Sequence, residues 1–153
     1  MDIQILQLVE GAQHAKGLTV IIDVFRAFTT ESFIMRRNPK KIIPVGDVEV
    51  AWDYKAKHPD AILCGERGGA IIPGFDYGNS PSAVAEADFT GKTVIHTTSA
   101  GTQGIVNAAG ADEILGGCLV NAKAIAYYIK KKQPEFVSLV CMGLAGKRPT
   151  DED

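Results

Sequence analysis

Acidic and basic side chains follow two apolar segments of the sequence, at points where a strand would give way to a loop. Asp23 ends one apolar run, and Arg26 opens the segment that follows it. Glu66 and Arg67 leave the end of a second run, Ala61–Cys64. Carboxylates suit a divalent cation, and a guanidinium group can hold an anion through paired hydrogen bonds. The four side chains therefore predict a site for a metal ion and an anionic group.

The loop after a third apolar run is rich in hydroxyl groups and glycine. It reads HTTSAGTQG, residues 96–104, and stands between an expected strand, Lys92–Thr97, and a helix expected near Gln103–Ala109. It matches neither a Walker A loop nor a G-x-G-x-x-G fingerprint. Exposed backbone amides at such a point can form a nest for a phosphate or sulfonate, with hydroxyls as further donors. The residues expected to contact the anion are Thr97, Thr98, Ser99, Gly101 and Thr102.

The glycine-rich segment Gly65–Pro81 is too long and irregular for an ordinary connection. After Glu66 and Arg67, two glycines leave the backbone free to bend closely around a ligand. Asn79 and Ser80 then supply an amide and a hydroxyl at an expected helix start, which again suits an anion. We therefore add Asn79 and Ser80 to the expected anion-binding residues.

Each of these features also has a purely structural interpretation. Asp23 can cap a helix while Arg26 lies on its surface, and Glu66 can pair with Arg67 inside a surface loop. His96 stands within an expected strand, so packing in the interior is the favoured interpretation for this residue. No G-x-S-x-G elbow supports a Ser-His-Asp triad. The sequence alone leaves these alternatives open.

Short apolar, β-branched runs alternate with segments of helical periodicity along most of the chain. The expected strands are Ile3–Val9, Leu18–Val24, Lys41–Val45, Ala61–Cys64, Lys92–Thr97, Glu113–Gly116 and Phe136–Cys141. The main expected helices are Ala27–Arg37, Val48–His58 and Ala122–Lys132. This alternation predicts an α/β, Rossmann-like layered fold around a largely parallel sheet. Sites in such folds form outside the carboxyl ends of the strands, where the three polar loops are expected to meet.

Composition limits the classes of function. At 153 residues, with 46% hydrophobic and 22% charged residues, the chain is expected to form a single α/β domain over residues 1–153. The formal net charge of −2 gives no electrostatic reason to expect nucleic acid. No apolar stretch approaches the ~20 residues of a membrane span. The N-terminus lacks a signal-peptide pattern and the three cysteines lack metal-binding spacing, so a cytoplasmic protein is expected.

The last residues, Thr150-Asp151-Glu152-Asp153, have the pattern of a helix start, a capping hydroxyl followed by carboxylates. We therefore expect the chain to be the N-terminal part of a longer fold, or a natural shortening of one. Strands at the edge of an incomplete sheet would favour association, and a homo-oligomer is left open.

Acidic residues for a metal, together with arginines and hydroxyl-rich loops for an anion, suit phosphoryl transfer to water. At these same loops the chain resembles the 2-phosphosulfolactate phosphatase family. The resemblance is carried by VIIDVFRAFTT, by GERGG followed by PGFDYGNSP, by TTSAGT, by LVNAKAIA and by the terminal LVCMG and DED. These motifs span nearly the whole chain in the family's order.

The resemblance implies a Mg²⁺-dependent phosphatase that hydrolyses a small phosphorylated acid, 2-phospho-3-sulfolactate, to sulfolactate and phosphate in coenzyme M biosynthesis. The expected Mg²⁺ ligands are Asp23, Glu66 and Asp153. Arg26 and Arg67 are expected to clamp phosphate or sulfonate, and Asp23, Glu66 and Arg67 are the expected catalytic residues. Whether Asp23 binds metal or attacks phosphorus is left open. The alternative function is a non-catalytic domain that binds a phosphorylated or sulfonated metabolite.

Overall fold

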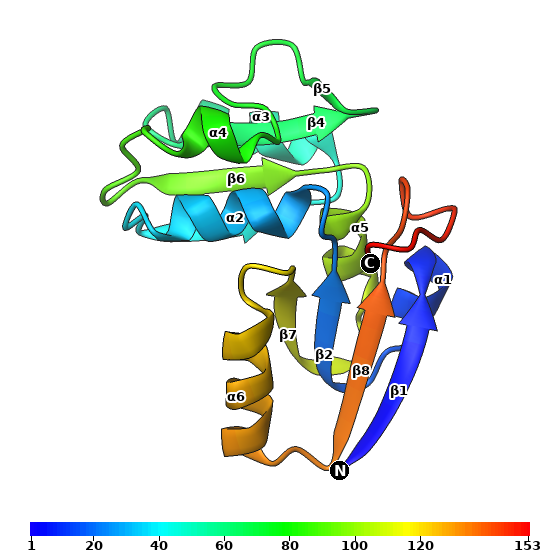
Figure 1. Ribbon diagram of the computed structural model, residues 1–153. Helices are drawn as coiled ribbons and strands as arrows, with labels where there is room; N and C mark the ends of the chain where they lie inside the picture. Colours follow the sequence, from blue (N-terminus) through cyan, green and yellow to red (C-terminus); the bar gives the residue numbers. More distant parts are fainter.

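Two four-stranded sheets organise the chain in the computed structural model, which describes residues 1–153 (Figure 1). The first, sheet A, is parallel throughout and has the order β1 (Asp2–Gln7), β8 (Phe136–Cys141), β2 (Gly17–Ile22), β7 (Ala111–Gly117). The second, sheet B, has the order β3 (Lys41–Pro44), β6 (Thr93–Thr97), β4 (Ile62–Arg67), β5 (Ala70–Ile71). Its first three strands are parallel, and β5 runs antiparallel to β4.

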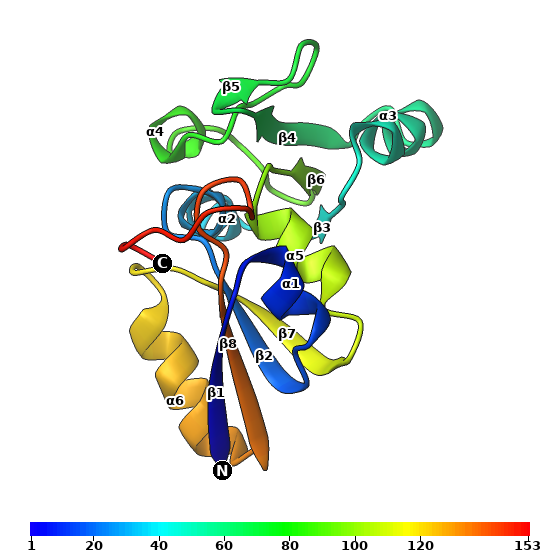
Figure 2. The same ribbon diagram turned by 90° about the vertical axis from the view of Figure 1, so that its right-hand side faces the viewer.

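Six helices connect and cover these strands. They are α1 (Leu8–Gln13), α2 (Ala27–Met35), α3 (Val48–Lys57), α4 (Pro81–Val84), α5 (Gly101–Asn107) and α6 (Ala122–Lys132). Figures 1 and 2 show α2 and α5 between the two sheets, and α6 beside sheet A. Because α5 contacts β2 and β7 of sheet A as well as β3 of sheet B, it joins the two halves of the molecule.

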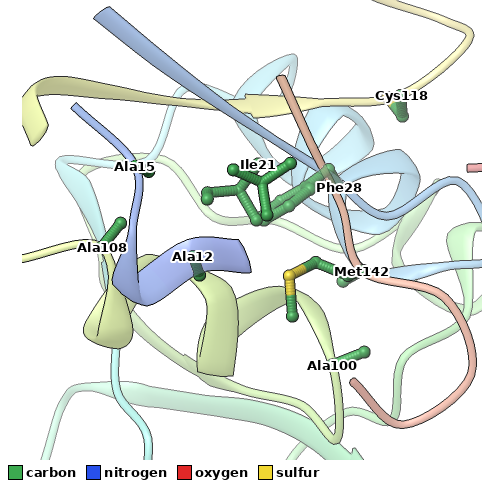
Figure 3. Packing of buried hydrophobic residues seen from close by; sticks show 10 residues of the cluster. Ala12, Ala15, Ile21, Phe28, Ala100, Ala108, Cys118 and Met142 are labelled. Atoms are coloured by element: carbon green, nitrogen blue, oxygen red, sulfur yellow. The ribbon is translucent and has the colours of Figure 1, made fainter. Parts of the chain in front are cut away.

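The main apolar core lies between sheet A and the helices above it. Phe28 of α2, Ile21 of β2 and Met142 after β8 are fully or almost fully buried there (Figure 3). Gly104 allows α5 to approach this layer, since an added Cβ would lie 2.5 Å from both Ile21 Cγ2 and Met142 Sδ. Burying each large side chain contributes roughly 1.5–3 kcal/mol. The core therefore depends on a small residue on α5 as much as on the large residues around it.

Sheet B has apolar layers on both faces. Ile95 of β6 packs with Leu63 and Ala51 on one face, while Val94 packs with Ile34 and Phe89 on the other. Strands buried on both faces are typical of parallel sheets covered by helices. This burial fixes the carboxyl ends of β4 and β6, from which two of the predicted site loops emerge.

The predicted α/β, Rossmann-like class with largely parallel strands is confirmed. The strands fall into two sheets, a division that the pattern of apolar runs did not reveal. Glu66 and Arg67 lie within β4 rather than beyond it, because Gly68 and Gly69 make a two-residue hairpin that pairs Arg67 with Ala70 of β5. Both glycines have positive φ, 60° and 84°, as such a turn requires. None of the helices has both the length and the apolar character needed to cross a bilayer.

Candidate functional site

A cavity of about 150 Å³ lies where the carboxyl ends of β2, β4 and β6 meet the segment after β8. Six of the residues predicted from the sequence line it: Asp23, Arg26, Glu66, Asn79, Ser99 and Asp153. They come from five separate segments of the chain. The structure therefore brings the three predicted loops and the end of the chain together at one place.

Asp23 lies just beyond β2 and is 5% exposed. Its Oδ1 accepts a hydrogen bond from Ala27 N–H at 3.0 Å, and its Oδ2 accepts one from Gly101 N–H at 2.8 Å. The pKa of this carboxyl is raised from 3.8 to about 6, chiefly by burial; the nearby charge of Asp153 also raises it, and the two amide hydrogen bonds act in the opposite direction. The site thus contains an acidic group that loses its proton less readily than an exposed aspartate.

Glu66 is also buried and is held by three donors. Its Oε1 accepts a hydrogen bond from Ser99 N–H at 2.6 Å. Its Oε2 accepts hydrogen bonds from Gly69 N–H at 2.7 Å and from the Ser99 hydroxyl at 3.1 Å. The hairpin after β4 and the loop after β6 therefore fix this carboxylate from both sides.

The hydroxyl-rich loop after β6 binds anions that belong to the chain itself. The amides of Ser99 and Gly101 were expected to bind a phosphate or sulfonate. They donate instead to the carboxylates of Glu66 and Asp23. Thr98 and Thr102 bond to each other, with each hydroxyl accepting the other residue's N–H at 2.7 and 3.1 Å. Neither threonine lines the cavity. The loop's role in the structure is to position the two acids.

Arg67 and Thr97 lie outside the cavity. The Arg67 guanidinium donates to the carbonyls of Glu66 and Gly46 at 2.7 and 2.8 Å, and to the Thr97 hydroxyl at 2.8 Å. These bonds tie β4 and β6 to the loop after β3. The predicted anion clamp at Arg67 is therefore a structural tie in this conformation, leaving Arg26 as the guanidinium that lines the cavity.

Arg26 and Asn79 have the free groups that a ligand needs. Arg26 is exposed at the cavity, and none of the ion pairs of the chain involves it. Asn79 is 7% exposed, and its Oδ1 is buried without a hydrogen-bond partner. Ser80, by contrast, bonds to the Ser82 hydroxyl at 3.0 Å and does not line the cavity. Arg26 and Asn79 are thus the predicted substrate contacts that the geometry favours.

Comparison with known proteins gives the family. A family model described as 2-phosphosulpholactate phosphatase matches residues 3–153. The chain belongs to the 2-phosphosulpholactate phosphatase family. Among its curated relatives, each named "Probable 2-phosphosulfolactate phosphatase", the protein of Caldanaerobacter subterraneus is 38% identical over 136 residues, which cover 87% of this chain and 56% of the relative.

Two further relatives in the family show the same extent of similarity. The protein of Carboxydothermus hydrogenoformans is 39% identical over 132 residues, covering 86% of this chain and 55% of the relative. That of Thermoplasma acidophilum is 37% identical over 134 residues, covering 88% and 60%. This family member therefore spans little more than half the length of the curated relatives that it matches.

The predicted set of three magnesium ligands is not assembled as a single cluster. The chain contains no group of three or more His, Cys, Asp or Glu side chains arranged to hold a metal ion. Asp23 and Asp153 line the same cavity and interact electrostatically, whereas Glu66 already accepts three hydrogen bonds. Magnesium is usually held by one or two carboxylates, with water and substrate oxygens completing its shell. Asp23 and Asp153 fit that mode; an all-protein site including Glu66 does not.

The segment after β8 forms a wall of the site that the sequence indicated only in part. Asp153 accepts hydrogen bonds from Val24 N–H and Gly143 N–H, both at 2.7 Å, and is thereby fixed beside Asp23. Leu144 and Glu152 also line the cavity, and so does Phe25. Phe25 and Leu144 are 73% and 54% exposed, so the rim of the cavity is apolar. The signal that could have identified this wall is Gly143 at the carboxyl end of the last strand.

His96 is packed in the interior, in agreement with its structural interpretation. It is 0% exposed, and its Nδ1 lies 2.7 Å from Glu31 Oε1 of α2. It does not line the cavity. Its pairing with Glu31 joins β6 to α2, which begins just after Asp23 and Arg26.

Proposed function

We propose that this chain carries a Mg²⁺-dependent phosphatase activity on a small phosphorylated acid, converting 2-phospho-3-sulfolactate to sulfolactate and phosphate as a step of coenzyme M biosynthesis. Family membership supports the phosphatase chemistry. The observation that carries the proposal is the pair of fixed carboxylates, Asp23 and Asp153, in a cavity of about 150 Å³ that also contains the unpaired Arg26. A cavity of this size suits a three-carbon acid better than a nucleotide.

The charges around the cavity support a cation as part of the substrate complex. Four carboxylates line it, those of Asp23, Glu66, Glu152 and Asp153, against the single guanidinium of Arg26. A phosphorylated and sulfonated acid would be repelled by this excess of negative charge. A divalent ion held by Asp23 and Asp153 would reduce the repulsion, and when bound it would supply Lewis-acid stabilisation of phosphoryl oxygens and an activated water.

The chain's own residues then have distinct tasks. Arg26 binds the phosphoryl or sulfonate oxygens through its guanidinium. Asn79 contributes its amide N–H groups to the same anion, and its Oδ1 accepts from a water molecule or substrate donor. We assign Asp23 to the metal rather than to attack on phosphorus, because Asp153 lines the same cavity beside it and two neighbouring carboxylates suit a divalent ion. Hydrolysis forms a bond between a water oxygen and phosphorus and breaks the bond between phosphorus and the ester oxygen, which takes up a proton from that water and leaves as the hydroxyl group of the acid.

The test is phosphate release by the purified chain from 2-phospho-3-sulfolactate, with Mg²⁺ and with EDTA. Release that requires Mg²⁺ and falls at least about 100-fold in Asp23→Asn is expected, a loss of ~3 kcal/mol of transition-state stabilisation. The matched control is Asp53→Asn, which changes an exposed aspartate of α3 away from the cavity and keeps full activity.

Two outcomes would contradict the proposal. Tight binding of the substrate without release would support the non-catalytic metabolite-binding domain instead. If the chain neither binds nor hydrolyses the substrate, residues 1–153 do not perform the reaction.

A further inference from the structure

The outer edge of sheet A is an open strand. β1 pairs with β8 on one side and with no strand on the other. Figure 2 shows β1 in the foreground, with this edge toward the viewer. Its sequence, DIQILQ, has no proline and no lysine, and its register with β8 runs from Asp2 to Gln7 without a bulge. Proline, lysine and bulges commonly protect edge strands in proteins, and an edge without them is a template for another strand.

The register shows which groups face this open edge. Asp2 N–H donates to Glu135 O at 2.8 Å, toward β8. Because successive residues of a strand turn their N–H and C=O groups to opposite sides, those of Ile3 and Ile5 point away from β8. The side chains of Ile3 and Ile5 are 56% and 70% exposed. Each of these residues presents both unpaired backbone groups and an apolar side chain.

Ile3 and Ile5 extend an apolar face that α6 covers only in part. Ile5 is in register with Leu139 of β8, and Leu139 is in register with Val20 of β2. Leu139 and Val20 line an apolar groove of about 400 Å³ beside α6, a helix that has no buried residue. The apolar row therefore continues outward from the groove to β1, where Ile5 is left in solvent.

We propose that two copies of this chain associate through β1, antiparallel about a two-fold axis at Gln4, so that the two four-stranded sheets become one continuous sheet. The strand is complementary to itself in this register. Ile3 lies opposite the partner's Ile5, and Ile5 lies opposite the partner's Ile3, with all four side chains on one face. Cross-strand apolar pairs of this kind stabilise antiparallel sheets.

The backbone groups and charges agree with the same register. Ile3 and Ile5 both turn their N–H and C=O groups outward, so they meet as hydrogen-bonded pairs, and Gln4 meets the partner's Gln4 in a non-hydrogen-bonded pair. Asp2 lies opposite the partner's Leu6, so no two like charges face each other. A shift of one residue would place Ile3 opposite the partner's Leu6, whose side chain points to the other face. Shifts of two residues keep the backbone groups paired but place Ile5 opposite Met1 or Ile3 opposite Gln7, so only the register at Gln4 pairs both isoleucines of each strand with isoleucines.

Sedimentation velocity over a range of protein concentrations tests the association. A reversible dimer is expected for the full chain, and Ile5→Lys is expected to weaken it at least tenfold by placing a charge in the apolar cluster. Val50→Lys is the matched control, because Val50 is 50% exposed but lies on α3, which packs beside sheet B. This control leaves the dimer unchanged. A monomer at all concentrations, or equal effects of the two variants, would overturn the proposal.

Disulfide trapping tests the register independently. Non-hydrogen-bonded antiparallel pairs have Cα atoms about 4.5 Å apart, within the range that a disulfide spans. Gln4→Cys is therefore expected to form a covalent dimer on mild oxidation, whereas Ile3→Cys, which faces the partner's Ile5, forms little. The wild-type chain under the same conditions controls for its three free cysteines. Equal trapping of the two variants, or none in Gln4→Cys, would exclude the proposed pairing.

Discussion

At the scale of single residues, the amides of the loop after β6 bind the chain's own carboxylates. Ser99 N–H bonds to Glu66 and Gly101 N–H bonds to Asp23. The sequence predicted that this loop binds the phosphate or sulfonate of a ligand, but a pattern of glycine and hydroxyl groups cannot specify which anion is bound. The difference matters for mechanism, because such a loop controls the position of the two acids, and of its predicted anion-binding residues only Ser99 lines the cavity.

The buried carboxyl of Asp23 predicts a dependence of stability on pH. Its pKa in the folded state is raised to about 6, chiefly by burial, from the ordinary value of 3.8. The folded state therefore favours the protonated form. The stability that this group contributes is fully present below pH 3.8 and is lost as the pH rises through about 6, by about 3 kcal/mol in total.

The measurement is the free energy of unfolding of the wild-type chain and of Asp23→Asn, by urea denaturation in metal-free buffer from pH 4 to pH 7. Asparagine loses one of the two amide hydrogen bonds at every pH, which adds a constant offset. The wild-type chain is expected to lose stability relative to the variant as the pH rises. Parallel curves would contradict a raised pKa at this position.

The absence of a side chain at Gly101 allows the start of α5 to lie close to Asp23. A Cβ at this position would lie 2.8 Å from Ala27 Cβ and 2.9 Å from Asp23 Oδ2. We expect Gly101→Ala to displace the carboxylate, to destabilise the fold by about 1–3 kcal/mol and to lower phosphatase activity at least about tenfold. Thermal unfolding and phosphate release measure the two effects.

Ser99→Ala is the matched comparison for Gly101→Ala. It removes the hydroxyl bond to Glu66 and the bond that the hydroxyl accepts from Gly68 N–H, but it keeps the amide bond, so a cost of about 1 kcal/mol is expected. If Gly101→Ala were as mild as Ser99→Ala, the close approach of α5 to Asp23 would not control the site.

At the scale of elements, the sequence predicted strands and helices better than it predicted where the strands end. The apolar run Ala61–Cys64 was recognised, but β4 continues to Arg67, because the hairpin at Gly68 and Gly69 adds a partner strand. Apolar periodicity carries no information about Glu66 and Arg67, whose extended conformation depends on pairing with β5. The predicted helix Ala122–Lys132 was found with the same bounds, because its period and its lysine-rich end are local features.

The hairpin between β4 and β5 gives a prediction of its own. Gly68 has a φ of 60°, and a Cβ there would meet nothing within 4 Å, so only backbone strain opposes substitution. We expect Gly68→Ala to destabilise the fold by about 1 kcal/mol, and Gly68→Asn by less, because asparagine tolerates the left-handed region. Urea denaturation of the two variants measures this difference. Equal costs would mean that the turn does not hold this conformation in solution.

At the scale of the whole molecule, the site depends on both sheets. Asp23 and Asp153 follow β2 and β8 of sheet A, whereas Glu66 lies in β4 of sheet B, and Asn79 and Ser99 follow strands of that sheet. The two sheets were not separable in the sequence, because each contains segments from both halves of the chain. Residues that are distant in sequence therefore reach one cavity only if the sheets keep a fixed relation. Two helices contact both sheets: α5, and α2 through Phe28 and Ile34.

Gly104 of α5 provides the means to test this coupling. An added Cβ would lie 2.5 Å from Ile21 and Met142, both in the core of sheet A, so Gly104→Ala is expected to cost about 2–3 kcal/mol. Trp52, the only tryptophan, packs edge-on against Phe75 beside sheet B and reports on that half. If α5 makes the two sheets one cooperative unit, the unfolding midpoints from Trp52 fluorescence and from far-ultraviolet circular dichroism fall together. If the Trp52 transition of Gly104→Ala stays at its wild-type midpoint, sheet B unfolds independently. A site built across both sheets would then form only when each sheet is stable by itself.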